Sequence, residues 1–230
     1  MTTYVIGDIH GCFSALTCLF NKLTWTPQDT FVFLGDMIDR GENSKEVIDF
    51  ILCLKKQVKV ICLKGNHEVM LLKAAEGHQG VLSAWLTYGG VETLDSYQTN
   101  EDEEDWTMAI PQAHWIFFEN LLPYYETVDY IFVHAGLDPF LPLKLQSEND
   151  LFWEHLHNGN IKAHQSGKTI IVGHTILKEG YVYDYGHTIM TDTAAYAGGW
   201  LSCYDLEQKV VHQANIQSQY RQTNPIKQST

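Results

Sequence analysis

Residues 31–41 read FVFLGDMIDRG, an apolar run of β-forming side chains followed by a glycine and a cluster of charged residues. A short apolar run that is closed by a turn signal is typical of a buried strand. The same order recurs at residues 4–11, YVIGDIHG, and at residues 58–68, VKVICLKGNHE. Between these runs, apolar side chains recur at helical spacing over residues 16–23 and 47–52. The alternation of strand and helix predicts an α/β fold built from βαβ units.

The second half of the chain is expected to be mostly sheet. Strand patterns return at residues 130–133, 169–172, 181–183, 188–190 and 201–204. We expect one catalytic domain over residues 1–215, with a variable and mainly helical region at residues 76–129. Residues 216–230 are rich in Gln, Ser, Asn and Thr, and they are predicted to form a flexible tail.

Polar side chains follow five of the expected strands. Besides the three stretches quoted above, HAG follows a strand at residues 134–136 and GHT follows another at residues 173–175. One aspartate–histidine pair after a strand is more typical of a turn or a helix cap. Five such clusters at the carboxyl ends of strands, where open α/β sheets bind ligands, favour a metal site instead.

The candidate ligands are carboxylate, imidazole and amide side chains, with no thiolate: Asp8, His10, Asp36, Asn66, His134 and His174. Six such donors are too many for one tetrahedral zinc ion, so two metals fit better. One carboxylate must then bridge the ions, and a water between them is acidified into a hydroxide nucleophile. Two divalent ions, two aspartates and a hydroxide sum to about one positive charge, which attracts a phosphate group.

The amino-acid composition indicates which kinds of partner the protein could bind and which cellular compartment to expect. The 230 residues include 28 acidic and 15 basic side chains, a formal charge of −13. Such an acidic chain is not expected to bind nucleic acid through its phosphates. The five cysteines include no C-x-x-C pair, so reduced thiols are expected. We find no signal-like leader and no apolar run of membrane-spanning length, which predicts a cytoplasmic protein without a membrane partner.

The ordered motifs resemble those of the calcineurin-like metallophosphoesterases: GDIHG at 7–11, GDMIDRG at 35–41, GNHE at 65–68, HAG at 134–136 and GHT at 173–175. GDMIDRG and GNHE are similar in particular to motifs of the bacterial and phage phosphoprotein phosphatases. The likeness covers about residues 4–206. It implies a four-layer α/β fold, in which two packed mixed β-sheets are flanked by helices.

The resemblance also implies how the ligands are shared between two divalent ions. Manganese is expected, with iron or zinc as alternatives. Asp36 would bridge the pair. One ion would be held by Asp8, His10 and Asp36, and the other by Asp36, Asn66, His134 and His174.

Further roles follow from the same resemblance. His67 would be the general acid that protonates the leaving oxygen, and Asp39 would orient it and favour its charged form. Arg40 would bind two phosphoryl oxygens, a task that suits its planar guanidinium. Asn66 would contact the substrate as well as a metal.

The chain departs from the family pattern in one place. Relatives usually carry an arginine two residues after the indole that corresponds to Trp153, as a second phosphate clamp, whereas this chain has Trp153-Glu154-His155. A protonated His155 would replace that arginine in part. An ordinary surface histidine is the alternative.

The resemblance predicts a two-metal phosphomonoesterase that acts on phosphoserine or phosphothreonine of a phosphoprotein or phosphopeptide, with phosphotyrosine as a further substrate. Phosphorus would be attacked directly by a metal-bridging hydroxide. The alternative is hydrolysis of dinucleoside tetraphosphates at the same site, and a third hypothesis is a non-catalytic binding module. The sequence carries no signal for an oligomeric state.

Two features of residues 76–129 bear on the choice between these substrates. The acidic run EDEED at residues 101–105 would repel a polyanion and favour a phosphopeptide with basic flanks, if it borders the cleft. The region is rich in aromatic side chains that a nucleobase could stack on, although such side chains are more often part of the core. The aromatic side chains in question are Trp85, Tyr88, Tyr97, Trp106 and Trp115.

Overall fold

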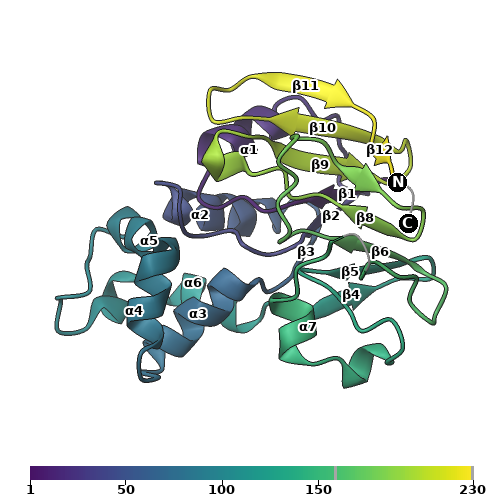
Figure 1. Cartoon of the computed structure of the whole chain (residues 1–230). Coiled ribbons are helices and arrows are strands. Elements are labelled where there is room, and N and C mark those ends of the chain that lie inside the picture. The colour runs from purple at the N-terminus through teal and green to yellow at the C-terminus, as the bar shows by residue number, and fades with distance from the viewer. Residues whose placement is uncertain (158–159, 229–230) are drawn as a thin grey trace.

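Two mixed β-sheets form the centre of the computed structural model (Figure 1), which describes residues 1–157 and 160–228. Each sheet has six strands within that described part of the chain. The first has the order β11-β10-β9-β1-β2-β3, with β1 at Thr3–Ile6, β2 at Thr30–Phe33, β3 at Lys59–Cys62, β9 at Leu201–Asp205, β10 at Val210–Ala214 and β11 at Tyr220–Thr223. The second has the order β12-β7-β8-β6-β5-β4, with β4 at Tyr124–Glu126, β5 at Tyr130–Val133, β6 at Thr169–Val172, β7 at Tyr183–Asp184, β8 at Thr188–Met190 and β12 at Ile226–Lys227.

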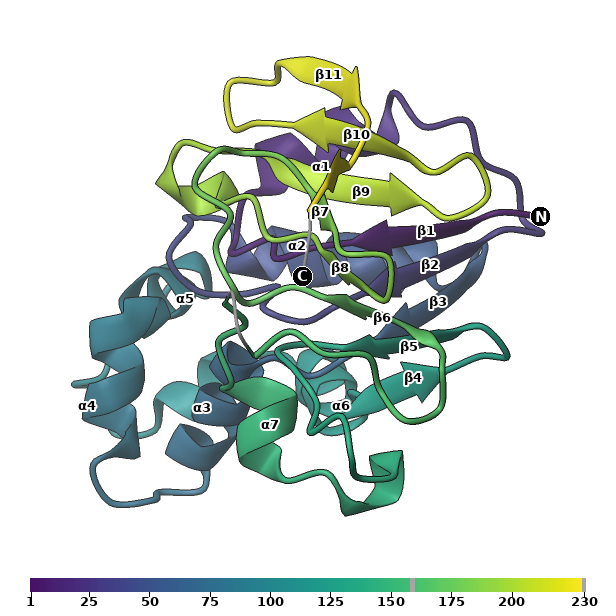
Figure 2. The ribbon, with the colours of Figure 1, turned by 45° about the vertical axis from the view of Figure 1, so that its right-hand side comes forward.

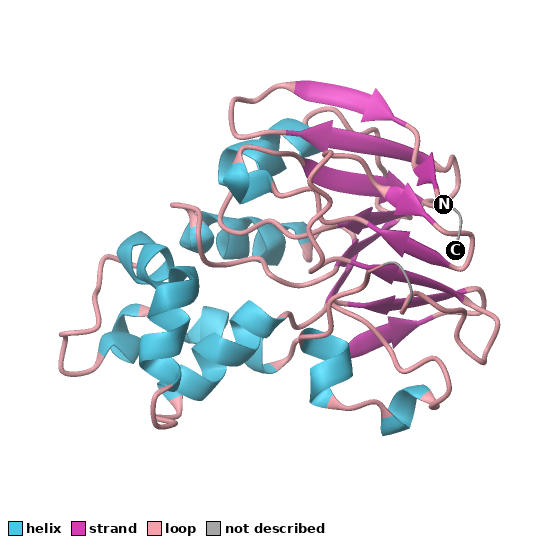
Figure 3. Ribbon diagram, in the orientation of Figure 1, coloured by secondary structure: helices cyan, strands magenta, loops and turns pink. Residues whose placement is uncertain are grey.

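Helices lie along the outer side of the first sheet and at one end of the molecule (Figure 3). The longer helices are α1 at Phe13–Phe20, α2 at Ser44–Leu54, α3 at Asn66–Ala75 and α6 at Gln112–Glu119. The shorter ones are α4 at Val81–Trp85, η1 at Leu86–Gly90, α5 at Val91–Ser96, η2 at Trp106–Ala109, η3 at Leu143–Leu145, α7 at Glu148–Phe152 and η4 at Ala195–Ala197. Among the described residues, none of these helices has the length and apolar character that a membrane crossing needs.

The central strands are apolar on both faces because both faces are buried. In β2, Phe31 and Phe33 pack in the cluster that contains side chains of α1 and α2. The intervening Val32 packs in a second cluster with Phe132 and Ile171 of the other sheet. Strands β1, β2 and β3 are parallel, and a parallel strand covered on both sides reads as a continuous apolar run. The predicted pair of packed mixed sheets with flanking helices is confirmed.

The helices α3, α4, α5 and α6 gather beside the sheets, at the lower left of Figure 1. They place a helical wall next to the carboxyl ends of β1, β2 and β3. The mainly helical region expected at residues 76–129 therefore contains α4, α5 and α6. Its last residues form the edge strand β4, which the sequence does not predict.

The prediction of a flexible tail over residues 216–230 is wrong for the residues that form β11 and β12, while residues 229–230 lie outside the described part. Strand β11 pairs with β10 of the first sheet, and Figure 2 shows the chain descending from it to β12, which pairs with β7 of the second sheet. The guanidinium of Arg221 lies 4.2 Å from the ring centroid of Trp200 and hydrogen-bonds to the carbonyl of Gly180. The polar composition of this segment gave no sign of these partners, because they are distant in sequence.

Two further strand expectations need correction. The strand expected at residues 181–183 is β7, which begins only at Tyr183. Strand β10 at Val210–Ala214 was not expected, although it pairs with β9 along five residues. Its alternation of apolar and polar side chains is short, and its register is fixed by neighbours rather than by its own pattern.

Candidate metal centre

Five strands bring the predicted ligands to one edge of the sheets. Asp8 and His10 follow β1, Asp36 follows β2, and Asn66 begins α3 directly after β3. His134 follows β5 and His174 follows β6. The structure thus brings together all six side chains at the carboxyl ends of strands.

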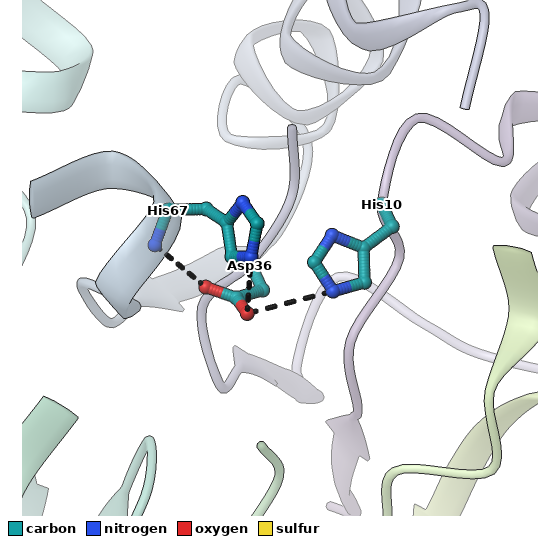
Figure 4. Close-up of side chains that lie close together, drawn as sticks. All are labelled: His10, Asp36 and His67. Carbon is teal, nitrogen blue, oxygen red and sulfur yellow. Dashed lines mark hydrogen bonds and ion pairs between the residues drawn. The ribbon is translucent and has the colours of Figure 1, made fainter. Parts of the chain in front are cut away.

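Asp36 lies at the centre of this group (Figure 4). Its Oδ2 is 3.5 Å from His10 Nε2 and 3.9 Å from His67 Nε2, and its Oδ1 is 3.4 Å from His134 Nε2. Two sets of side chains could therefore hold an ion, namely Asp36 with His10 and His67, and Asp36 with His134 and His174. Asp36 belongs to both sets, which is the arrangement that a bridging carboxylate requires.

The orientation of the histidines fits metal ligation. His10 Nδ1 lies 3.0 Å from the carbonyl oxygen of Ile38, and His134 Nδ1 lies 3.0 Å from that of Leu34. Each Nδ1–H donates to a carbonyl, which leaves the Nε2 lone pair pointing toward Asp36; a second partner of this kind is typical of metal-bound histidine. His134 Nε2 then faces two acceptors, the Oδ1 of Asp36 and the Oδ1 of Asn66 at 3.0 Å. These three atoms all carry lone pairs and repel one another, so a cation bound between them would stabilise the arrangement.

Burial keeps these histidines in the neutral form that binds metals. It lowers the pKa of His10 well below the usual value and lowers that of His134, and it lowers the pKa of His174 to about 3. His174 directs its Nε2 to the carbonyl of Trp153 at 3.3 Å, so that Nδ1 is left for an ion. The centre therefore offers imidazole donors without their own positive charge.

Buried carboxylates give a second reason for cations at this edge. The carboxylate of Asp8 accepts the backbone N–H of His174, and burial together with Asp192 and Asp36 raises its pKa well above the usual value. Asp192, to which the sequence reasoning gave no role, is also buried, and burial raises its pKa to about 6. Mutual repulsion of this kind is relieved by bound cations, so the residues present fit a pair of divalent ions.

The loop that carries Asp36 is held by Glu68, a residue that sequence reasoning missed. The Glu68 carboxylate accepts the backbone N–H groups of Asp36 at 2.9 Å, Met37 at 2.7 Å and Gly65 at 2.9 Å. It is the last residue of the GNHE motif, and its place at the start of α3 is typical of a capping box. The motif thus joins the loop after β2 to the loop after β3.

His67 and Asp39 form a buried pair. His67 Nδ1 lies 2.6 Å from Asp39 Oδ2, which also accepts the indole N–H of Trp85 at 2.8 Å. The hydroxyl of Thr93 donates to the other oxygen, Oδ1, at 2.6 Å. Burial lowers the pKa of His67, but Asp36 and Asp39 more than offset this, so the net shift is upward. The pair leaves Nε2 of His67 facing the metal ligands, as a proton donor requires.

Arg40 is placed by contacts from two directions. Its backbone N–H donates to the carbonyl of Gly89 at 3.0 Å, and its Nη1 lies 3.0 Å from His10 Nε2. The guanidinium carbon lies 4.5 Å from the ring centroid of Tyr196, which the sequence did not single out. The Tyr196 ring also meets His10 edge-on at 4.9 Å. Arg40 therefore borders the metal ligands with its planar face covered.

The ligands open into a cleft of about 620 Å³. His155 lines this cleft and stacks on His174 with ring centroids 4.4 Å apart, so it lies at the site rather than on a remote surface. No described residue of the acidic run at 101–105 lines the cleft. The preference for a phosphopeptide with basic flanks was expected only if this run bordered the cleft, so that argument does not apply. Of the five aromatic side chains considered, Trp85, Tyr97 and Trp106 are buried in the core, and Trp115 packs against it, whereas Tyr88 is exposed in the cleft.

Comparisons with known sequences agree with this site. A family model described as calcineurin-like phosphoesterase matches residues 1–205. A protein of Marinomonas sp. (strain MWYL1), named bis(5'-nucleosyl)-tetraphosphatase, symmetrical, is 34% identical over 140 residues, which are 60% of this chain and 46% of that protein. A protein of the same name from Cellvibrio japonicus (strain Ueda107) is 30% identical over 144 residues, which are 62% of this chain and 48% of that protein. The matches thus span just under half the length of these relatives.

Solved structures share the fold. The crystal structure of a candidate diadenosine tetraphosphatase has a TM-score of 0.68 at 18% identity, and the likeness covers 97% of this chain and 93% of that one. The cold-active protein-tyrosine phosphatase of a psychrophilic Shewanella has a TM-score of 0.63 at 16% identity, covering 97% of this chain and 80% of that one. At such identities the likeness concerns the fold alone, and the fold serves more than one substrate.

The prediction that the chain is a protein phosphatase is wrong on these comparisons, since the curated relatives carry the tetraphosphatase name. The motifs GDMIDRG and GNHE misled because the roles that the resemblance implies for them, holding ions and a phosphoryl group, do not depend on what the phosphate is attached to. The broader prediction of a metal-dependent phosphoesterase is confirmed. The matched residues 1–205 include every candidate ligand, and the chain belongs to the calcineurin-like phosphoesterase family.

Proposed function

We propose that this protein hydrolyses the phosphoanhydride of dinucleoside polyphosphates, and cleaves a bis(5'-nucleosyl) tetraphosphate symmetrically into two nucleoside diphosphates. The observation that carries the proposal is the name shared by the curated relatives at 30–34% identity. Hydrolysis of dinucleoside tetraphosphates, the alternative that the sequence analysis set beside protein dephosphorylation, is therefore favoured. The reaction adds one water to the central anhydride and breaks one phosphorus–oxygen bond.

Six side chains would hold two divalent ions, for which manganese remains our expectation: Asp8, His10, Asp36, Asn66, His134 and His174. When bound, such ions withdraw charge from phosphoryl oxygens and lower the pKa of coordinated water. The mixed oxygen and nitrogen donors of the site suit manganese, iron or zinc.

The remaining steps are assigned to side chains of the chain itself. Arg40 would donate to two oxygens of the phosphoryl group that is attacked, where negative charge develops in the transition state. His67 would give the proton on Nε2 to the oxygen of the departing nucleoside diphosphate, while Asp39 holds Nδ1 at 2.6 Å. Both roles place the reacting phosphorus in the cleft between Arg40 and His67, which both line it.

The charge of the cleft suits a polyanion although the whole chain is acidic. Among the described lining residues, Arg40 and Lys73 are cations and Asp36 is the carboxylate, which belongs to the metal centre. The exposed rings of Tyr88 and Trp153 line the same cleft. A ligand that combines a polyphosphate with aromatic bases matches these surroundings better than a phosphorylated side chain alone.

The proposal is tested by product analysis. Manganese-loaded protein is incubated with diadenosine tetraphosphate in ¹⁸O-labelled water. The product nucleotides are separated by anion-exchange chromatography, and their masses are measured by mass spectrometry. We expect ADP as the sole product, with one labelled oxygen for every two ADP molecules. Asp36→Asn serves as the inactive control.

Three outcomes would contradict the proposal. Formation of AMP and ATP would mean that cleavage is not symmetrical. Hydrolysis of a phosphopeptide without hydrolysis of diadenosine tetraphosphate would mean that the substrates are phosphomonoesters. Absence of turnover on every phosphate ester would favour a binding module.

A further inference from the structure

The cleft continues well beyond the metal ligands along one face of α3. Asn66, Val69, Met70 and Lys73 all line it, and their spacing of three and four residues places them on one side of the helix. At 1.5 Å per residue, the helix advances about 10 Å between Asn66 and Lys73. The cleft is therefore long enough for more than the phosphoryl group that reacts.

The wall opposite α3 comes from α4 and η1, and it is largely apolar. Val81, Ala84 and Tyr88 line the cleft from this side at intervals of three or four residues, together with Gly80. Together with Val69 and Met70 of α3, they leave an apolar section between the metal centre and Lys73. A flat apolar group with a charged phosphate at one end fits such a section.

Tyr88 is exposed, yet its backbone is fixed. The ring lines the cleft and the residue is 57% exposed. The next residue, Gly89, accepts the backbone N–H of Arg40 at 3.0 Å and has φ 110°, and a Cβ there would lie 2.7 Å from the Arg40 nitrogen. A Cβ on Gly90 would lie 2.5 Å from the Trp85 ring. The two glycines therefore hold Tyr88 directly beside the residue that we assign to phosphate binding.

We infer that Tyr88 stacks on one nucleobase of the dinucleoside polyphosphate, while the adjoining phosphates extend from Arg40 toward the metal centre. The inference deepens the proposed function and rests on it for the identity of the ligand. Stacking on a preplaced aromatic ring is tolerant of the base and strengthens binding severalfold or more.

The test uses a pair of ligands that differ only in the nucleoside. Binding of adenosine 5'-(α,β-methylene)diphosphate and of methylenediphosphonate to the manganese-loaded full chain is measured by isothermal titration calorimetry. Neither ligand is hydrolysed at its bridging carbon. We expect Tyr88→Ala to weaken the nucleotide analogue about tenfold and to leave methylenediphosphonate within twofold. Tyr88→Phe keeps the ring and is expected to bind like the parent protein.

Phe140→Ala is the matched control, because Phe140 is an aromatic residue that is 71% exposed and is absent from the lining of the cleft. Equal loss of both ligands in Tyr88→Ala would overturn the inference, as would unchanged binding of the nucleotide analogue. Failure of the parent protein to distinguish the two ligands would overturn it as well. These outcomes concern binding, so they separate this inference from the proposed function, which depends on product analysis with diadenosine tetraphosphate.

Discussion

Individual residues of the centre occupy backbone conformations that L-residues rarely adopt. His10, Asp36 and His174 have φ values of 48°, 49° and 57°, and Asp39 and Arg40 have values of 73° and 70°. Each such residue costs about 1–3 kcal/mol and persists where the surroundings determine its conformation. Glu68 supplies part of that determination by binding the N–H of Asp36. Strain at five adjoining site residues indicates that the loops are shaped for ligation rather than for local stability.

Substitution of the bridging residue and of the proposed acid should have separable effects. Asp36→Asn removes the charge that both ligand sets share, so we expect manganese content and turnover to fall together. His67→Asn should keep the metal and lower turnover of phenyl phosphate by about 10²–10⁴, because a poor leaving group depends on protonation. p-Nitrophenyl phosphate, whose leaving group is better, should lose much less. Metal content by mass spectrometry and kcat on both esters check this.

The outcome for His67 decides between two roles. Because His67 Nε2 lies 3.9 Å from Asp36 Oδ2, this histidine could also ligate an ion. Loss of manganese in His67→Asn would assign it to the metal. Equal loss of turnover on the two esters would remove the acid role.

Tyr196 is expected to position Arg40. Its ring covers the guanidinium at 4.5 Å, and a contact of this kind contributes about 0.5–2 kcal/mol. Tyr196→Leu should lower kcat/KM for diadenosine tetraphosphate by about tenfold, corresponding to about 1.4 kcal/mol, with manganese content unchanged. Tyr196→Phe preserves the ring and should restore the activity. A loss of the same size in the phenylalanine variant would assign the effect to the hydroxyl instead.

At the scale of elements, three polar side chains join α5, α6 and α2, of which Tyr97 and His114 are buried and Asp49 is exposed. Tyr97, which follows α5, has its hydroxyl 2.7 Å from His114 Nδ1, and His114 Nε2 lies 3.0 Å from Asp49 Oδ1. The Tyr97 hydroxyl donates to Nδ1 of His114, and the Nε2–H of His114 donates to Asp49. This arrangement requires the neutral form of the His114 imidazole. Burial lowers the pKa of His114, although Asp49 opposes the shift. The helices α5 and α6, which pack against η1 and α3 of the cleft, are thereby joined to α2.

The contacts of His114 predict how the stability of the protein depends on pH. Because the folded pKa of His114 lies below its unfolded value of about 6.5, its contribution to stability is present above pH 6.5 and is lost as the pH falls through the folded pKa. His114→Gln does not titrate, so the difference in the free energy of unfolding between parent and variant should narrow from pH 7.5 to pH 5. Urea unfolding of both proteins with manganese present measures it.

The exposed His78 provides the matched control. Its ring pairs with the exposed Glu76 at 2.9 Å, and His78→Gln should follow the parent protein across the same pH range. A constant difference between the parent protein and His114→Gln would show that the imidazole is not held neutral.

At the scale of the whole molecule, the last strands tie the two sheets together. β11 belongs to the first sheet and β12 to the second, and Arg221, which lies in β11, contacts Tyr181 before β7 and Trp200 before β9. Its guanidinium lies 4.7 Å from the Tyr181 ring and 4.2 Å from the Trp200 ring. The guanidinium also donates to Gly180 and to Gln213 of β10, so Arg221 holds the loop before β7 against β10.

Arg221→Ala should therefore lower stability without a change in chemistry. Two hydrogen bonds from the guanidinium, to Gln213 and Gly180, and two ring contacts predict a loss of about 2 kcal/mol in the free energy of unfolding. Gln222→Ala, at the exposed neighbouring position of β11, should cost less than about 0.5 kcal/mol. Urea unfolding compares the two variants, and kcat/KM should equal that of the parent protein in both. Equal stability of the two variants would show that β11 is not held through Arg221.

The sequence by itself determined the class of fold and identified the candidate metal ligands. Asp8, Asp36 and His174 each follow an apolar strand and a glycine, so a local pattern of an apolar run, a glycine and a donor was enough to place them at one edge. Only the tertiary structure decided which residues support the candidate ligands and which line the cleft. Glu68, Asp192 and Tyr196 act through partners that their own neighbours in sequence do not reveal, and Tyr88 gained meaning only when α4 and η1 packed opposite α3. The physical reason is that strand ends converge by a general rule of sheets, whereas contacts between separate loops depend on how the whole chain packs.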